Sequence, residues 1–367
     1  MMLPSISLLR NVLRDSEAIA SMSLADWDLL IRQGRSADLL GQIAAACDTG
    51  CGFTNIPVQP RLHIASAANL AKRQLRELEW EVEQIRDALD SRGFPLVLLK
   101  GAAYAMSGSA AARGRLVSDV DILVRREDLA AVESALMLRG WVSAAKSEYD
   151  QHYYRTWMHE IPPMKHFQRG TVIDVHHAIL PLTARFHPST EKLLAAARPL
   201  ARDAKIKVLS PVDMVLHSAS HLFHEGELGQ GLRGLVDIDS LLAEFGCQEQ
   251  FWAALVPRAV ELELSRPLFY ALRYASIMLG TPLPVSVSAE LADAPGGRQS
   301  GFMLRWMDSL FLRALRPPHT SAADKLTPVA RWLLYLRGHW LRMPPWLLIR
   351  HLARKLVIPA NKPFEAQ

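Results

Sequence analysis

The stretch RLVSDVDILV, residues 115–124, places two aspartates one residue apart inside an apolar, β-branched run. Side chains alternate along a strand, so Asp119 and Asp121 share one face while Val120 and Ile122 line the other. Two carboxylates on one face repel each other, and they are costly to desolvate without a positive partner. The pattern therefore predicts a buried strand whose polar face meets a metal ion, an arginine or water.

The composition is that of a globular protein. The chain has 367 residues, of which 50% are hydrophobic, and a net charge of +5 that says little about partners. No stretch approaches the roughly 18 apolar residues of a spanning helix, and the N-terminus lacks the apolar segment of a signal peptide. The three cysteines, Cys47, Cys51 and Cys247, complete neither a zinc set nor a disulfide framework. We therefore expect a cytoplasmic protein.

Apolar spacing and turn residues divide the chain into four expected parts. The fold class is α/β (α+β), a small mixed sheet flanked by helical regions. The parts are an N-terminal helical arm (1–92), an α/β core (93–190), a helical domain (191–324) and a basic, Trp/Leu-rich C-terminal segment (325–367).

Two further strands are expected beside 115–124. FPLVLLKG (94–101) is a compact apolar run that ends in Lys100-Gly101, and GTVIDVHHAI (170–179) carries Asp174. This order of strand, glycine turn, D-x-D strand and third carboxylate resembles the nucleotidyltransferase superfamily with a DNA polymerase β-like core. Within it, the motifs LLKG, Arg115 and DVDILV are similar to the signature of an uncharacterised bacterial nucleotidyltransferase family.

The resemblance implies a polymerase β-like fold and transfer of an NMP from an NTP to an unknown acceptor (a small molecule, sugar, peptide or protein). It implies that Asp119, Asp121 and Asp174 hold two Mg²⁺ ions, with Mn²⁺ as a substitute, and that Asp174 is the usual candidate for the base. Two such ions stabilise charge on the attacking and leaving oxygens, and hard cations prefer carboxylate ligands. Ser118 and His176, which shares the face of Asp174, are expected to lie around the site.

The phosphate-binding turn departs from the superfamily pattern. Gly-Gly or Gly-Ser is usual there, so that backbone N–H groups reach the triphosphate, whereas this chain has Lys100-Gly101. Lys100 could then contact phosphate as a point charge. Arg115 matches an arginine of the family signature, and it is expected to bind phosphate or to pair with the carboxylates.

A rival hypothesis is a non-catalytic module that binds a nucleotide or a protein. A buried Arg115 bridging both strand aspartates would favour the module, and converging carboxylates beside an open pocket would favour the enzyme.

Three histidines on one expected helix face, His217, His221 and His224, have ligand-like spacing. Core or capping histidines are more frequent than a metal site of this kind. The resemblance implies that His221, Arg233 and Asp237 brace the helical arm, and Arg233 and Asp237 have the spacing of an i,i+4 pair.

The stretch 325–364 holds eight Lys/Arg and no Asp or Glu, with Trp332, Trp340 and Trp346 among its leucines. Such a helix can lie peripherally on an anionic membrane, here at the inner face. The alternative is that its Trp/Leu face packs on the helical domain while the arginines stay solvated. No nucleic-acid recognition motif is present, so specific nucleic-acid binding is not expected.

Overall fold

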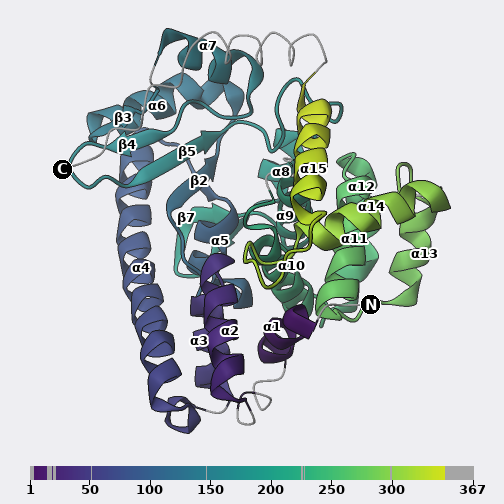
Figure 1. Cartoon of the computed structure of the whole chain (residues 1–367). Coiled ribbons are helices and arrows are strands. Elements are labelled where there is room, and N and C mark those ends of the chain that lie inside the picture. The colour runs from purple at the N-terminus through teal and green to yellow at the C-terminus, as the bar shows by residue number, and fades with distance from the viewer. Residues whose placement is uncertain are drawn as a thin grey trace.

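The computed structural model describes residues 4–343, except 15–18, 20–21, 51, 146, 225, 227 and 298–299. A seven-stranded sheet has the strand order β3-β4-β5-β2-β1-β7-β6 (Figure 1). β2 runs parallel to β5 and antiparallel to β1, so the sheet is mixed and the expected α/β class is confirmed. The strands are β1 (Leu96–Leu98), β2 (Asp119–Leu123), β3 (Trp141–Ser143), β4 (Met164–His166), β5 (Val172–His176), β6 (Arg198–Leu200) and β7 (Asp203–Val208).

Two of these strands come from a part of the chain beyond the expected core, 93–190. β7 pairs parallel with β1, with Leu98 opposite Val208, and β6 pairs with β7. Lys205 and Lys207 alternate with the buried Ile206 and Val208, which is the period of a half-buried strand. The expectation of a mostly helical chain after 190 missed this short alternation, and the sheet extends to Val208.

The N-terminal helices are α1 (Pro4–Arg14), α2 (Leu24–Ser36), α3 (Leu40–Thr49) and α4 (Val58–Asp90). The long α4 runs beside the sheet (Figure 1) and buries Val82, Ile85 and Leu89, one helical turn apart, toward the core. The buried Glu81 accepts hydrogen bonds from both Nε and Nη2 of Arg169 (3.0 and 2.9 Å), in the turn before β5. This ion pair fixes α4 against the turn between β4 and β5.

The remaining helices are α5 (Lys100–Ser107), α6 (Leu129–Leu138), α7 (Glu148–Trp157), α8 (Thr190–Ala196), α9 (Pro211–His224), α10 (Gly231–Phe245), α11 (Glu249–Glu261), α12 (Ser265–Tyr274), α13 (Val285–Asp293), α14 (Gly301–Ala314) and α15 (Thr327–Arg342). Phe223 of α9 packs against Tyr270 and Tyr274 of α12 and Phe311 of α14, with ring centroids 5.3–5.9 Å apart. α9 is thus the centre of the helical region, and it also packs on α5 and α10.

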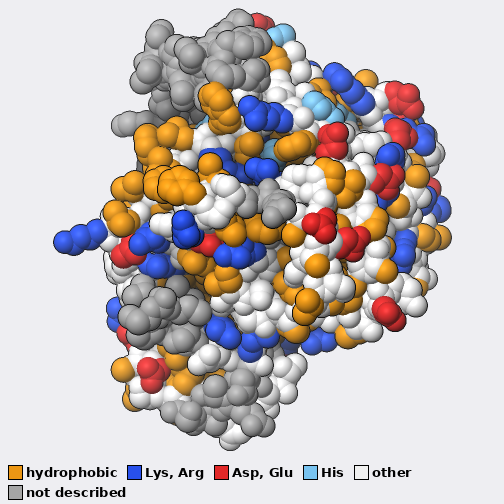
Figure 2. All heavy atoms as spheres, turned by 90° about the vertical axis from the view of Figure 1, so that its right-hand side faces the viewer, with side chains coloured by type: hydrophobic (Ala, Val, Ile, Leu, Met, Phe, Trp, Pro, Cys, Tyr) orange, Lys and Arg blue, Asp and Glu red, His pale blue; other side chains and the backbone are white. Residues whose placement is uncertain are grey.

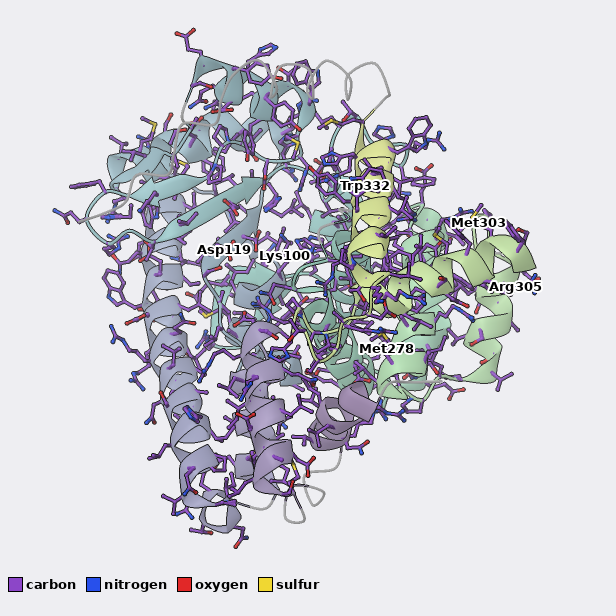
Figure 3. All side chains as sticks on the ribbon, in the orientation of Figure 1. Lys100, Asp119, Met278, Met303, Arg305 and Trp332 are labelled. Atoms are coloured by element: carbon purple, nitrogen blue, oxygen red, sulfur yellow. The ribbon has the colours of Figure 1, made fainter. Side chains whose placement is uncertain are left out.

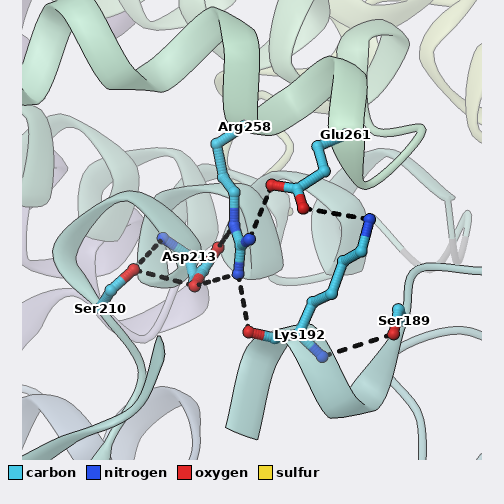
Figure 4. Close-up of polar contacts among 6 residues, drawn as sticks. All are labelled: Ser189, Lys192, Ser210, Asp213, Arg258 and Glu261. Atoms are coloured by element: carbon cyan, nitrogen blue, oxygen red, sulfur yellow. Dashed lines mark hydrogen bonds and ion pairs between the residues drawn. The ribbon is translucent and has the colours of Figure 1, made fainter. Parts of the chain in front are cut away.

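An ion-pair network joins the helical region to the end of the core (Figure 4). Arg258 of α11 donates from Nε and Nη2 to the two carboxylate oxygens of the fully buried Asp213 (2.8 and 3.0 Å). The same guanidinium donates to the carbonyl of Lys192 on α8 (2.9 Å). The Lys192 ammonium pairs in turn with Glu261 (3.0 Å), so α8, α9 and α11 are tied together.

α15 exposes its tryptophans instead of burying them. Trp332 is 59% exposed and Trp340 is 51% exposed. Arg337 packs inward: it donates to the carbonyl of Phe223 (2.9 Å) and lies over the ring of Tyr270. The described tryptophans therefore do not pack on the helical domain as this alternative expected, and Arg337 is not solvated, although the leucine side of the helix does pack, with Leu334 buried. Trp346 lies outside the described residues.

The face of the molecule that carries α11 to α15 shows hydrophobic and basic side chains interspersed along one side (Figure 2). Within the described residues, no helix is long and apolar enough to span a membrane.

Candidate active site

Two carboxylates face each other on neighbouring strands at the centre of the sheet. β2 and β5 are parallel, and their register places Asp121 directly opposite Asp174. Directly paired residues point to the same side of a sheet, so these side chains share a face. Val120 and Ile173 are buried on the other face. The alternation predicted from the sequence therefore holds, and the third carboxylate lies where the expected order of strands put it.

Asp121 is 5% exposed and is held by two cationic or donor groups. Its Oδ1 accepts from the Lys100 ammonium (3.1 Å) and contacts Nε2 of His176 (2.9 Å). Burial alone would raise the pKa of Asp121, but Lys100 and His176 outweigh burial and hold that pKa well below its usual range. Asp121 is therefore a carboxylate that stays ionised inside the protein.

Asp174 is in the opposite electrostatic situation. Its Oδ1 is buried and has no hydrogen-bond partner. Burial, followed by the nearby carboxylates of Glu160 and Asp121, raises the pKa of Asp174 to about 7. The uncompensated negative charge at this point is what a bound cation would neutralise.

Asp119 lies at the start of β2, on the solvent side of the pair. It is half-buried, and its Oδ1 accepts from the hydroxyl of Ser118 (3.0 Å). Figure 3 shows Asp119 and Lys100 at the centre of the molecule, where β2 and the start of α5 meet.

The turn between β1 and α5 contains an unusual backbone conformation. Lys100, the first residue of α5, has φ +45°, in the left-handed region that favours glycine. A Cβ on the next residue, Gly101, would lie 2.0 Å from Nη1 of Arg115. A side chain at position 101 would therefore force the Arg115 guanidinium, which lies against this backbone, to move.

Arg115 does not pair with the strand aspartates. Its Nε donates to Asp237 of α10 (2.9 Å), and its guanidinium lies 5.6 Å from the ring centre of Tyr104. The expectation that Arg115 pairs with Asp119 or Asp121 is therefore wrong, because a carboxylate from a distant helix is within reach. The bridging contact that would have favoured a non-catalytic module is not formed.

The expected i,i+4 pair between Arg233 and Asp237 is also not formed. Arg233 pairs with Asp38, between α2 and α3, while Asp237 pairs with Arg115 and accepts from Gln42 of α3 (3.3 Å). Both residues reach outward from α10 to other elements, so α10 is joined to the N-terminal arm.

A cavity of about 160 Å³ opens beside Lys100. α5, α9 and α10 form its walls, and its charged residues are mostly cationic. Its lining includes Lys100, Tyr104, Arg115, His221, Arg233 and Asp237. The cavity lies on the side of Lys100 that faces the helical region, next to the Lys100–Asp121 contact.

The histidines of α9 do not form a metal set in the described part of the chain. The His/Asp/Glu groups that come within ligand distance there are His159, Glu160 and His176. His224 instead packs against Phe186. Burial lowers the pKa of His217 and of His221 well below the usual value, so these side chains are neutral core and cavity-lining groups.

His159 and Glu160 were missed by sequence reasoning. They lie between α7 and β4, in a segment without strand or helix periodicity, and Glu160 bridges to His176 outside the named strands. The one available signal was the dipeptide His-Glu just before Ile-Pro-Pro. Such a dipeptide is too common to assign a site.

The mixed sheet with carboxylates on its central strands is that of a nucleotidyltransferase-type fold. A family model described as uncharacterised nucleotidyltransferase matches residues 23–280. The chain therefore belongs to this uncharacterised nucleotidyltransferase family, as its motifs predicted. No curated protein and no solved structure matches the chain.

Proposed function

We propose that this protein transfers an NMP from an NTP to a hydroxyl or phosphate of an unidentified acceptor. The observation that carries the proposal is the Asp121–Asp174 pair on parallel strands, with Asp119 two residues before it on the same strand. The cationic cavity beside Lys100 supports the proposal because a triphosphate needs positive charge next to the carboxylates.

The residues present fit the divalent ions that such a reaction uses. Asp119, Asp121 and Asp174 would hold Mg²⁺, or Mn²⁺ in its place, and the buried, unpartnered Oδ1 of Asp174 is a ligand atom in need of a cation. When bound, two such ions would neutralise charge on the reacting phosphate and on the leaving group.

The chain's own groups have distinct proposed roles. Lys100 and the cavity that it lines would bind the phosphates of the NTP, with Gly101 allowing the close approach of the backbone. Arg115 would contribute positive potential to that cavity while it remains paired with Asp237. Asp174 is the proposed proton acceptor, because it lies across from Asp121 on the neighbouring strand. Ser118 and His176 orient Asp119 and Asp121.

The test is loss of transfer in Asp119→Asn and Asp121→Asn. The protein is incubated with α-labelled NTPs, Mg²⁺ and a fractionated extract, and NMP adducts are identified by mass spectrometry. We expect both variants to lose transfer, while Asp90→Asn, a surface carboxylate paired with Lys205, retains it. Wild-type transfer in both site variants would overturn the two-metal mechanism. Nucleotide binding without transfer by the wild type, in every fraction, would favour the non-catalytic module.

The two variants differ in their expected stability. Asp121 is buried between Lys100 and His176, so Asp121→Asn removes charged hydrogen bonds and should lower the free energy of unfolding by about 2 kcal/mol. Asp119 is half-buried, and its described side-chain contact is with Ser118, not with a charged group. Asp119→Asn should therefore change the free energy of unfolding less than Asp121→Asn does. Removing the Asp121 charge also relieves its repulsion with the neighbouring carboxylates. This gain is smaller than the loss of the two hydrogen bonds, because Lys100 and His176 already neutralise the Asp121 charge.

We also propose peripheral contact with an anionic membrane through 325–364, of which 344–364 lies outside the described residues. The exposed Trp332 and Trp340 of α15 support this contact, because an exposed tryptophan flanked by basic residues is suited to the lipid interface. The preceding helix α14 adds Phe302 and Trp306, which are 74% and 49% exposed. α14 packs against α15, so the surface belongs to two helices.

A further inference from the structure

A second group of potential metal ligands adjoins the carboxylates. His159, Glu160 and His176 each offer a ligand atom, and these atoms lie within 4.8 Å of one another. His159 and His176 are 7% and 2% exposed, and their ring centroids are 5.2 Å apart. Nε2 of His176 lies 3.5 Å from Oε2 of Glu160. The three side chains therefore converge on one small, nearly dry volume.

The backbone holds this group in place. Glu160 and His176 form an antiparallel β-bridge, and the carbonyl of His159 accepts from the N–H groups of His177 and Ala178 (2.8 and 3.2 Å). Backbone hydrogen bonds therefore fix the segment before β4 to the end of β5, and they do not depend on side chains. A site arranged in advance loses little conformational entropy when an ion binds.

Two ring nitrogens of this group have no hydrogen-bond partner. Nδ1 of His159 and Nδ1 of His176 are buried and have no partner, as is true of Oδ1 of the neighbouring Asp174. Buried polar atoms without partners are rare and destabilising. A cation bound by the nearby nitrogens and carboxylates would satisfy part of this deficit.

We propose that His159, Glu160 and His176 bind one divalent ion of the zinc class. Two imidazoles and one carboxylate form the ligand set of zinc sites that keep a fourth position open. Mg²⁺ prefers oxygen ligands, so nitrogen at two positions selects against it. The ligand set differs from the three aspartates proposed for Mg²⁺ and adjoins them, because His176 also contacts Asp121. The inference does not depend on nucleotidyl transfer.

The test measures metal binding directly on the full chain after removal of metals by a chelator. Zn²⁺ affinity is obtained by competition with a chromophoric chelator, and Co²⁺ is added as a spectroscopic probe of four-coordinate geometry. We expect tight binding of one ion, little competition from millimolar Mg²⁺, and an intense visible Co²⁺ spectrum. His159→Gln and Glu160→Gln should each weaken Zn²⁺ binding by about 100-fold or more, and circular dichroism and thermal unfolding check that both variants fold.

Two controls separate this site from its neighbours. His217→Gln changes a buried histidine of α9 and should retain wild-type Zn²⁺ affinity, as should Asp119→Asn, which is expected to lose transfer. Equal Zn²⁺ affinity in the wild type and in folded His159→Gln or Glu160→Gln would overturn the proposal, and so would equal loss in His217→Gln. If the protein shows Mg²⁺-dependent transfer but no tight Zn²⁺ binding, the zinc-class site is refuted and the proposed transfer stands. Zn²⁺ binding without any transfer would refute only the proposed function.

Discussion

Lys100 combines an unfavourable backbone conformation with a central position. Its φ of +45° lies in a region where most side chains are strained, yet its ammonium reaches Asp121 (3.1 Å) and lines the cavity beside it. Strained residues persist where the surrounding structure holds them, and they are concentrated at functional sites. Lys100 therefore occupies a backbone conformation that glycine would adopt in a glycine-rich phosphate turn, and it adds a positive charge there.

Replacing Lys100 by glycine and by alanine separates its charge from its backbone. Both variants lose the ammonium, so we expect both to bind a non-hydrolysable NTP analogue at least about tenfold more weakly, with a reduced salt dependence. Lys100→Gly relieves the left-handed strain, and it should be more stable than Lys100→Ala by about 1 kcal/mol. Isothermal titration calorimetry and urea unfolding measure the two effects. Unchanged affinity in both variants would mean that Lys100 only ends the strand.

At the scale of elements, α9 connects the site to the helical region. Its Ser218 side chain contacts the hydroxyl of Tyr104 on α5, and Phe223 lies in the aromatic cluster. His217 and His224 are buried, and burial followed by Arg337 and Arg342 lowers the pKa of His224 to about 4. The packing of α9 therefore favours the neutral form of these histidines, because burial disfavours a charged imidazole.

This burial predicts acid-sensitive stability. His224 has an ordinary value of 6.5 in the unfolded chain and about 4 in the folded chain, so below pH 6.5 the unfolded state binds a proton that the folded state does not. The contribution of His224 to the free energy of unfolding should therefore fall as the pH drops from 6.5 to 4, by about 1.4 kcal/mol per pH unit. His217 and His221 act in the same direction.

Urea unfolding of the wild type and of His224→Gln at pH 7.5, 6 and 5 tests this prediction. The variant should lose the part of the pH dependence that one proton contributes. The raised pKa of Asp174 acts in the opposite direction, so the comparison with the variant is decisive. Equal pH dependence in the wild type and in folded His224→Gln would contradict the assignment of His224 as a neutral, buried group.

At the scale of the whole molecule, α14 and α15 present an apolar surface with basic residues nearby. Phe302, Trp306, Trp332 and Trp340 are exposed on these two helices. Exposed Arg305 is also on α14 (Figure 3). The inner side of α15 is built into the protein through the buried Leu334 and the half-buried Arg337, so deleting the C-terminal segment would damage the helical region itself. Point variants on the outer side are the better probe.

Sedimentation with lipid vesicles tests the membrane contact. We expect the wild type to bind phosphatidylglycerol-containing vesicles at low salt and not pure phosphatidylcholine, because basic residues are attracted to anionic headgroups. The double variant Trp306→Ala/Trp332→Ala should bind at least about tenfold more weakly. Leu62→Ala and Trp80→Ala on α4, which are 68% and 47% exposed, are matched controls. No binding at low salt, or equal loss in the controls, would contradict the proposed contact.

Local patterns in the sequence determined the fold class, the family and the strand pair. The period-2 alternation around Asp119 and Asp121 requires a strand with one carboxylate face, and the apolar run before Lys100-Gly101 requires a strand that ends in a turn. These features depend on residues a few positions apart, so periodicity reveals them. The long helix α4 lies in the helical arm that the same kind of spacing predicted over 1–92.

Only the tertiary structure decided which side chains meet. Arg115 and Asp237 are 122 positions apart, and Asp121 and His176 are 55 apart. Glu160 joins His176 from a segment without regular structure, and β7 enters the sheet beside β1 after an intervening hundred or so residues. No local period encodes such pairs, because they arise when whole elements pack and bury their apolar faces together. The charge partners of the site, and the exposure of the α15 tryptophans, follow from that packing.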